Sequence, residues 1–517
     1  MIPGVGPGAD EVLAELTRLR AGDAPTHGGR TLAYVYDSGL GDLDELAARA
    51  HAAASSANGL DPTAFPSLLH MENDLVGTAI ELLGGGRAAV GTVTSGGTES
   101  CLLAVLAARE GRRDVVDPSI VVPSTVHAAF RKAGHLFGVR VVSVPVDPTT
   151  FRADPDATAA AIDHTTVLVV ASAPSYAHGV VDPIPEIAAV AREHGVRLHV
   201  DACIGGWVLP YLRRERVGTR APAFDLSVPG VTSLSVDLHK YAYCAKGVSV
   251  LLHADAELRR GHYFASADWP GYTMLNPTLQ STRSGGPLAA AWAVVRHVGD
   301  DGYAALARTA RAATEEIRAG ITAIDGLGVL GEPDSTLLAV ALDGDPGFDL
   351  FTVADELAAR GWYVQLQFPH ESSPANLHLT VTAANRGHED ALLTAMREAV
   401  TSAVAAGPVT LDDDLRALID ALDPEALTPE QFAGLLAAAG LGAGPDEDGP
   451  DEDGPDGNGD GRTGDGQGRG PGRPIRLPDR MAGINAMLAV ASPRLRERLL
   501  AEFLGTLYRP RAADASP

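Results

Sequence analysis

Residues 196–202 read VRLHVDA and residues 232–238 read TSLSVDL, two short β-branched runs with an aspartate near each end. Similar runs stand at 120–123 (IVVP), 139–146 (VRVVSVPV), 165–174 (TTVLVVASAP) and 248–253 (VSVLLH), separated mostly by stretches of helical length and composition. This alternation predicts an α/β fold with a largely parallel sheet. Because ligand sites of such sheets lie at the carboxyl ends of the strands, the residues that follow each run are the first candidates for a site.

The 517-residue chain is long enough for more than one domain. We expect an N-terminal segment over 1–90, a large domain over 91–320 and a small C-terminal domain over 321–440. The small domain should be α+β, with STLLAVAL at 335–342 and NLHLTVTA at 376–383 as strands. Residues 441–475, nearly all Gly, Asp, Glu, Pro and Arg, are predicted to form a disordered acidic linker, and 476–517 a helical segment.

Charge and cysteine content narrow the possible partners. The formal net charge of -25 argues against nucleic acid or anionic lipid as a partner, because both require clustered Lys and Arg. Cys101, Cys203 and Cys244 lack the spacing of a disulfide framework or zinc site, which favours no metal and a reducing, cytoplasmic location. No signal peptide and no apolar stretch of about 18 residues is present, so we expect neither export nor a membrane anchor.

Lys240 follows one of the β-branched runs. The segment 235–240 reads SVDLHK, and YAYCAKG follows at 241–247. A lysine at the edge of a sheet is placed to carry an aldehyde cofactor as a Schiff base. An isolated His-Lys pair is also typical of a surface strand end with solvated lysines, so the neighbouring segments decide between the two interpretations.

Three neighbouring segments suit a phosphorylated aromatic cofactor. TSGGTES at 94–100 opens a helix, whose first amides can hold a phosphate. Asp201 ends a strand, where a carboxylate can keep a pyridinium nitrogen protonated. His127 begins a helix after IVVP, where an imidazole can stack on a ring and relay protons. Each has a structural alternative, as a glycine turn, a helix cap or a structural histidine, but together they predict a pyridoxal 5'-phosphate (PLP) site at Lys240.

These segments resemble the group II PLP-dependent decarboxylases and, within them, the sphingosine-1-phosphate lyases. The matching motifs are TSGGTES at 94–100, HAAFRKAG at 127–134, AHGVVDPIPEIA at 177–188, HVDACIGG at 199–206, DLHKYAYCAKG at 237–247 and DWPGYTMLNPT at 268–278. The similarity runs from about residue 33 to 508. It implies the PLP fold type I, similar to aspartate aminotransferase, with the cofactor in the large domain at 91–320.

The resemblance also implies roles for single residues. Lys240 would anchor PLP, Asp201 would hold its ring nitrogen and His127 would stack on the ring. The cofactor phosphate would be bound by residues of the glycine turn and of the segment before Lys240, namely Gly96, Gly97, Thr98, Ser235 and His239. The segment Arg283, Ser284, Gly285 and Gly286 would reach the site of a neighbouring subunit, which implies a homodimer with active sites at the subunit interface.

The substrate pocket departs from the family at one position. Tyr36 and Lys246 match residues that contact the substrate phosphate in the lyases, and Tyr176 is expected to contact the substrate as well. Asp61 stands where the lyases carry a histidine, and a carboxylate facing a phosphate would repel it. Asp61 could instead pair with Lys246, meet an amine or hydroxyl of another substrate, or be an exposed turn residue. The loop 370–376 is also longer than its family counterpart.

Three functions remain open from the sequence. The first is retro-aldol cleavage of a 3-hydroxyamine, phosphorylated or not, into an aldehyde and an amine. The second is α-decarboxylation of an amino acid, which uses the same cofactor but breaks another bond. The third is a PLP-binding protein without turnover, against which the intact set of Lys240, Asp201 and His127 argues.

Overall fold

The computed structural model describes residues 6–61, 63–217, 220–438 and 480–508. The predicted acidic linker at 441–475 lies outside the described residues. Two compact units are distinguished: one comprises residues 25–350 and 356–405, and the other comprises the described parts of 1–24, 351–355 and 406–517. The five-segment division expected from the sequence stays a prediction.

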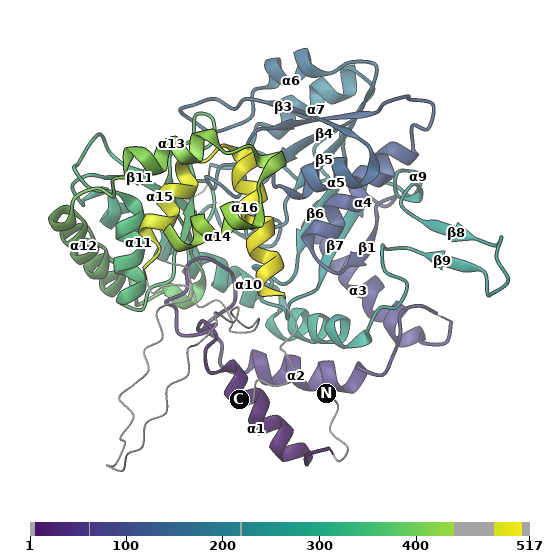
Figure 1. The fold of residues 1–517 in the computed structure, drawn as a ribbon. Helices are drawn as coiled ribbons and strands as arrows, with labels where there is room; N and C mark the ends of the chain where they lie inside the picture. The colour runs from purple at the N-terminus through teal and green to yellow at the C-terminus, as the bar shows by residue number, and fades with distance from the viewer. Residues whose placement is uncertain (1–5, 62, 218–219, 439–479, 509–517) are drawn as a thin grey trace, which may run out of the picture. The chain divides into compact units, whose positions relative to one another are not determined.

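The first unit is built on a seven-stranded sheet (Figure 1). Its strand order is β1-β7-β6-β5-β4-β2-β3, and β7 alone runs antiparallel to its neighbours. The strands are β1 (Val90–Thr94), β2 (Ser119–Pro123), β3 (Arg140–Val144), β4 (Thr166–Ser172), β5 (Arg197–Asp201), β6 (Val231–Asp237) and β7 (Ser249–His253). The β-branched runs of the sequence therefore form these strands, and the predicted largely parallel sheet is confirmed.

Side chains that alternate along the strands pack into two separate cores. On β2 and β4, Ile120 and Leu168 join the core that includes α4 (Gly97–Glu110) and α5 (Ala129–Phe137). Their neighbours Val121 and Val169 face the opposite core, with α3 (Pro66–Leu82), α7 (Ile184–Glu193) and α8 (Leu209–Glu215). Because successive strand residues point to opposite faces, the uninterrupted apolar runs are those of a sheet covered on both sides.

A second, antiparallel sheet of four strands lies in the same unit. Its order is β10-β11-β13-β12, formed by β10 (Leu327–Val329), β11 (Leu337–Leu342), β13 (Asn376–Thr380) and β12 (Gln365–Gln367). The hairpin of β8 (Phe264–Ser266) and β9 (Met274–Asn276) forms a separate two-stranded sheet. The predicted strands at 335–342 and 376–383 are thus neighbours in the smaller sheet, and the predicted α/β architecture with a second, smaller sheet is observed.

The remaining helices complete the two units. They are α1 (Ala9–Arg20), α2 (Leu43–Ala54), α6 (Pro155–Ala161), α9 (Ala256–Arg260), α10 (Gly285–Thr322), α11 (Leu350–Ala359), α12 (Glu389–Ala406), α13 (Asp413–Ala421), α14 (Pro429–Ala438), α15 (Ala482–Val490) and α16 (Pro493–Leu507), with short 3₁₀ turns at Ala383–Asn385 and Pro424–Ala426. α10 breaks at Gly299, whose φ of 63° lies in the left-handed region. Among the described residues, no helix combines the length and apolar character required to cross a bilayer.

The C-terminal helices of the second unit share a small core of their own. Ile419 of α13, Met487 of α15 and Leu499 of α16 are buried in one apolar cluster. At the start of α15, the carboxylate of Asp355 accepts hydrogen bonds from the amides of Met481 and Ala482 at 2.8–2.9 Å. A negative charge at a helix N-terminus satisfies amides that have no partner within the helix.

Candidate active site

A cavity of about 360 Å³ lies at the carboxyl ends of the central strands. Ser172 of β4 and Asp201 of β5 are paired in the sheet, and Asp237 ends the next strand, β6. The start of α4 and the turn after β6 line the same cavity. Of the residues predicted from the sequence, the cavity wall contains Gly96, Gly97, Thr98, His127, Tyr176, Asp201, His239 and Lys240.

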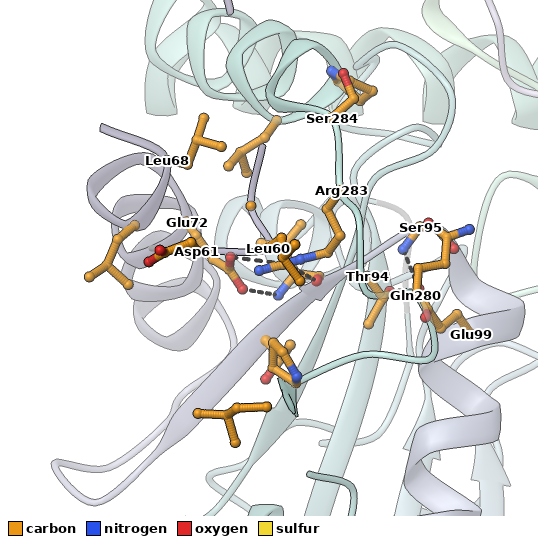
Figure 2. Close-up of a pocket in the computed structure, with 18 of the residues that line it drawn as sticks. Leu60, Asp61, Leu68, Glu72, Thr94, Ser95, Glu99, Gln280, Arg283 and Ser284 are labelled. Atoms are coloured by element: carbon orange, nitrogen blue, oxygen red, sulfur yellow. Dashed lines mark hydrogen bonds and ion pairs between the residues drawn. The ribbon is translucent and has the colours of Figure 1, made fainter. Parts of the chain in front are cut away.

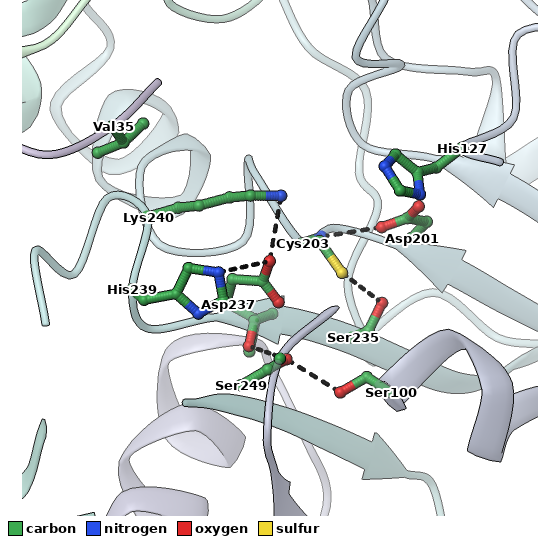
Figure 3. Close-up of polar contacts among 12 residues, drawn as sticks. Val35, Ser100, His127, Asp201, Cys203, Ser235, Asp237, His239, Lys240 and Ser249 are labelled. Carbon is green, nitrogen blue, oxygen red and sulfur yellow. Dashed lines mark hydrogen bonds and ion pairs between the residues drawn. The ribbon is translucent and has the colours of Figure 1, made fainter. Parts of the chain in front are cut away.

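The amine of Lys240 is held by a carboxylate that the sequence analysis did not assign. Its Nζ lies 3.1 Å from Oδ2 of Asp237, whose side chain is 2% exposed (Figure 3). Burial alone would lower the pKa of Lys240, but the charge of Asp237, with smaller contributions from Cys203 and Asp201, raises it above its usual value. The lysine is therefore an ammonium when no cofactor is bound. The i,i+3 spacing in a turn directly after a strand was the available signal.

The start of α4 lines the cavity and could hold an anion such as a phosphate. Gly96 has a φ of 151° and precedes the first turn, whose amides have no partner within the helix. A Cβ added at Gly97 would lie 2.7 Å from both oxygens of Asp237 and 2.9 Å from Sγ of Cys203. Glycine is thus required at position 97, because the helix end approaches the strand ends this closely.

Asp201 and His127 project into the cavity from neighbouring elements (Figure 3). Oδ1 of Asp201 accepts a hydrogen bond from the amide of Cys203 at 3.1 Å, and the residue is 8% exposed. None of the ion pairs formed in the described part of the chain includes Asp201. Nδ1 of His127 accepts from the amide of Ala129 at 3.2 Å, so the ring proton of the neutral imidazole is on Nε2. A buried carboxylate without a cation fits a protonated ring nitrogen.

Four of the predicted cofactor-binding residues lie outside the wall of this cavity, as do Tyr36, Asp61 and Lys246. Ser235, one pleat before the end of β6, contacts His199 and Cys203 at 3.2 Å each and is fully buried. Ser284, Gly285 and Gly286 begin α10, where Ser284 caps the helix. Added Cβ atoms at the two glycines would meet α2, 2.7 Å from the carbonyl oxygen of Ala54 and 2.6 Å from Nε2 of His51. The glycines therefore have a packing role within their own chain.

Lys246 and Tyr36 come together beside the anchor lysine. Nζ of Lys246 lies over the ring of Tyr36, 4.2 Å from its centroid, and donates to the carbonyl oxygens of Val35 at 2.5 Å and His239 at 3.0 Å. Lys246 is an exposed residue, but desolvation of its amine and the charge of Lys240 lower the pKa of Lys246 to about 8. The amine of Lys246 thus contacts the carbonyl oxygen of His239, the residue that directly precedes Lys240.

Asp61 is placed elsewhere. It lines a neighbouring cavity of about 1100 Å³, which also contains an ion pair between Glu72 and Arg283 at 3.1 Å (Figure 2). Oδ1 of Asp61 accepts hydrogen bonds from the amide and hydroxyl of Thr63, at 2.9 and 2.6 Å, and from the amide of Ala64 at 3.3 Å. These bonds lower the pKa of the exposed Asp61. Asp61 is therefore a turn residue that stays charged, and among the described residues it forms no ion pair with Lys246.

Tyr176 lines the cofactor cavity. Its hydroxyl donates to Oε1 of Gln365 at 2.9 Å, and its ring stacks on His378 with centroids 4.1 Å apart. The loop at 370–376 contacts the segment that follows Tyr176, because Ser373 Oγ and His178 Nε2 are 2.9 Å apart. Burial raises the pKa of Tyr176 to about 12, so it is a neutral hydrogen-bonding group at ordinary pH.

The cavity fits PLP on three counts: a lysine at a buried edge, a carboxylate without its own cation, and a glycine-lined helix start. The conserved domain of the pyridoxal-dependent decarboxylases matches residues 26–339. The chain belongs to this decarboxylase family. Its cofactor is PLP, and the predicted membership is confirmed. A second family model, for a C-terminal domain of pyridoxal-dependent enzymes described as an HTH domain, matches residues 413–453 and 462–506.

Within the pyridoxal-dependent decarboxylase family, the relatives are sphingosine-1-phosphate lyases. The lyase of Drosophila melanogaster is 37% identical over 386 residues, covering 74% of this chain and 69% of the relative. That of Dictyostelium discoideum is 38% identical over 358 residues, covering 69% of this chain and 66% of the relative. The chain thus spans about two thirds of the length of these relatives.

Solved structures agree with this assignment. The Burkholderia pseudomallei sphingosine-1-phosphate lyase has a TM-score of 0.73 and 37% identity, covering 78% of this chain and 93% of that one. A glutamate decarboxylase of Lactobacillus brevis has a TM-score of 0.68 at 19% identity, covering 79% of this chain and 96% of that one, and shares the fold. This member of the decarboxylase family therefore has the fold and the cofactor pocket of PLP enzymes.

Proposed function

We propose that this protein is a PLP-dependent carbon-carbon lyase that cleaves the C2–C3 bond of a phosphorylated 3-hydroxyamine into an aldehyde and a phosphorylated amine. The observation that carries the proposal is the second ammonium, Lys246, held over Tyr36 and against the carbonyl oxygen of His239, the neighbour of Lys240. A cation held beside the residue that precedes the anchor lysine suits an anionic group on a small amine substrate. The names of the relatives point to the same substrate class.

When bound, PLP supplies an electron sink that stabilises negative charge on the carbon next to the substrate amine. Lys240 would hold the cofactor covalently through Nζ, and Asp201 would keep its ring nitrogen protonated. The first amides of α4 and the imidazole of His239 would hold its phosphate. His127 lines the cavity, where its ring would pack on the cofactor and exchange a proton with it.

The bond that breaks depends on substrate contacts, because the cofactor activates whichever bond lies perpendicular to its ring. Lys246 and Tyr36 would fix the phosphate end and Tyr176 would contact the other side of the pocket. Asp61 does not oppose this arrangement: its charge is satisfied by Thr63 and Ala64 in an exposed turn, where solvent screens it.

The active unit is proposed to be a homodimer, in which Arg283 and Ser284 approach the site of the partner. The support is an exposed apolar surface on the β8–β9 hairpin, where Trp269, Tyr272 and Leu275 are 44%, 56% and 62% exposed. Such surfaces mark contacts with other molecules. The mass of the particle in solution, measured by light scattering, tests the proposed dimer: a monomer at micromolar concentration would contradict it.

The free thiols of all three cysteines support a reducing, cytoplasmic location.

The activity is tested with the PLP-loaded full chain and matched long-chain 3-hydroxyamines with and without a phosphate. We expect stoichiometric aldehyde and phosphorylated amine from the phosphorylated compound, with a lower kcat/KM for the other. Absence of aldehyde from both would refute the proposal. Release of carbon dioxide from an amino-acid panel would instead establish the decarboxylase alternative.

A further inference from the structure

We propose that the cofactor-free protein binds a soft divalent cation such as Zn²⁺ between Cys101, Cys203 and Asp201, and that this ion and PLP exclude each other. The two thiols and the carboxylate come from α4 and from the end of β5. Their spacing in the sequence gave no sign of a metal site, because Cys101 is far from the other two along the chain.

The geometry of the three side chains is that of an incomplete metal site. Sγ of Cys101, Sγ of Cys203 and a carboxylate oxygen of Asp201 all lie within 4.8 Å of one another, and all three residues are buried. Zinc-sulfur bonds of about 2.3 Å in a tetrahedron separate two sulfurs by about 3.8 Å, so closing the site requires shifts of about 1 Å or less. Three protein ligands leave a fourth position open.

The close approach of α4 creates this cluster. Gly97 and Cys101 are four residues apart and therefore share one face of α4. A Cβ on Gly97 would lie 2.9 Å from Sγ of Cys203, so any larger residue would push the helix away from the end of β5. The same glycine that admits a phosphate at the helix start thus brings the two thiols together.

An ion can reach the cluster through the cofactor cavity. Cys101, Asp201 and Cys203 all line the cavity that contains Lys240. The core therefore does not have to open for an ion to enter. Because the same opening serves PLP, an ion at this site and the cofactor would compete for one space.

Charge gives a second reason for exclusion. Asp201 takes part in none of the ion pairs of the described residues, and the polar partner of its Oδ1 is the amide of Cys203. A buried carboxylate is stabilised by a cation. In the loaded protein this is the protonated ring nitrogen of PLP, whereas in the cofactor-free protein the position is available to a metal ion.

The thiols select which metals can bind. A metal ion binds a thiol as the thiolate and displaces its proton. Zn²⁺, Co²⁺ and Cd²⁺ do so because they bind thiolates strongly, while Mg²⁺ and Ca²⁺ prefer oxygen ligands. Cys203 gives up its 3.2 Å contact with Ser235, whose hydroxyl keeps His199 as partner.

Metal binding is tested on the full chain after removal of PLP, with Co²⁺ as the spectroscopic probe. We expect a single tightly bound ion with a thiolate-to-metal charge-transfer band, absent with Mg²⁺ and lost in Cys101→Ala and Cys203→Ala. Cys244→Ala is the matched control, because Cys244 is a buried thiol that contacts the carbonyl oxygens of Ala242 and Ala291 instead. A wild-type protein without the band, or a band that survives both substitutions, would overturn the proposal.

Exclusion is tested by titrating PLP into the cofactor-free chain with and without Zn²⁺. At a Zn²⁺ concentration about ten times its dissociation constant, competition raises the apparent dissociation constant of PLP about tenfold. Cys101→Ala, compared with its own PLP titration in the absence of Zn²⁺, should lose this effect, which also separates it from binding of Zn²⁺ to free PLP. An equal effect in Cys101→Ala, or Co²⁺ bound equally by loaded wild-type protein, would refute exclusion. This part rests on the PLP site described above; the Co²⁺ band of the cofactor-free chain does not, so the two can fail separately.

Discussion

Replacement of Asp237 by asparagine should change how Lys240 reacts with PLP. In the cofactor-free protein the ion pair at 3.1 Å keeps Lys240 protonated, and only the neutral amine can attack an aldehyde. With an effective dielectric constant of about 20, two charges at this distance attract by about 5 kcal/mol. If rearrangement and solvent recover half of this energy, the neutral fraction of Lys240 still rises about 50- to 100-fold in Asp237→Asn.

The assay is the rate at which the visible absorbance of bound PLP appears after mixing with cofactor-free protein, measured as a function of pH. In the wild type, Lys240 stays protonated through the neutral range, so the rate should rise about tenfold for each pH unit. In Asp237→Asn, burial lowers the pKa of Lys240 and the rate should level off at lower pH. Lys240→Ala provides the blank. Superimposable pH profiles for the wild type and Asp237→Asn would refute this account of the ion pair.

Four further predictions concern binding and stability. Lys246→Met should raise KM for the phosphorylated substrate about 10- to 100-fold with little change in kcat. This factor corresponds to the free energy of one hydrogen bond to a charged group. The control Lys132→Met, at an exposed position, should change neither KM nor kcat. The wild-type KM should also rise above pH about 8, because Lys246 loses its charge as pH passes its pKa. Gly97→Ala should lower the free energy of unfolding, measured by chemical denaturation, by about 1–3 kcal/mol and should weaken PLP binding. In the control Gly77→Ala, where the added Cβ meets open space, the free energy of unfolding should rise by about 0.5–1 kcal/mol. Leu499→Ala should destabilise the C-terminal helices by about 2–5 kcal/mol in hydrogen exchange while PLP loading is retained.

Each of these has a clear contrary result. Equal KM increases for phosphorylated and unphosphorylated substrates in Lys246→Met would show that the amine does not act on the phosphate. A Gly97→Ala protein as stable as the wild type would mean that the start of α4 can move away from Asp237. Loss of PLP from Leu499→Ala would show that the C-terminal core supports the cofactor cavity.

Much of the cofactor site could be predicted because parallel strands place their ends together. The runs ending near Asp201 and Lys240 became β5 and β6, and His127 and the turn at Gly96 follow other strands of the same sheet. These placements depend only on the alternation of strands and helices, which short-range sequence patterns record. The resemblance to the decarboxylase family then supplied roles that periodicity alone could not.

Side chains near the site were harder to predict where one pleat or one turn decides the outcome. Ser235 and Asp237 both lie on β6, yet Asp237 reaches Lys240 while Ser235 stays behind the cavity against His199. Asp61 could have faced Lys246, but its carboxylate closes a turn with Thr63 instead. Such choices depend on the exact register of strands and on competing local hydrogen bonds.

The sequence by itself therefore determined the parallel sheet and the placement of Asp201 and Lys240 at the ends of its strands, because these follow from order along the chain. Only the tertiary structure decided that Asp237 holds the amine of Lys240 and that Cys101 meets Cys203. The first contact depends on how the turn after β6 folds, and the second needs the close approach of α4 to the strand ends that Gly97 allows. Distance along the chain carries no record of that approach.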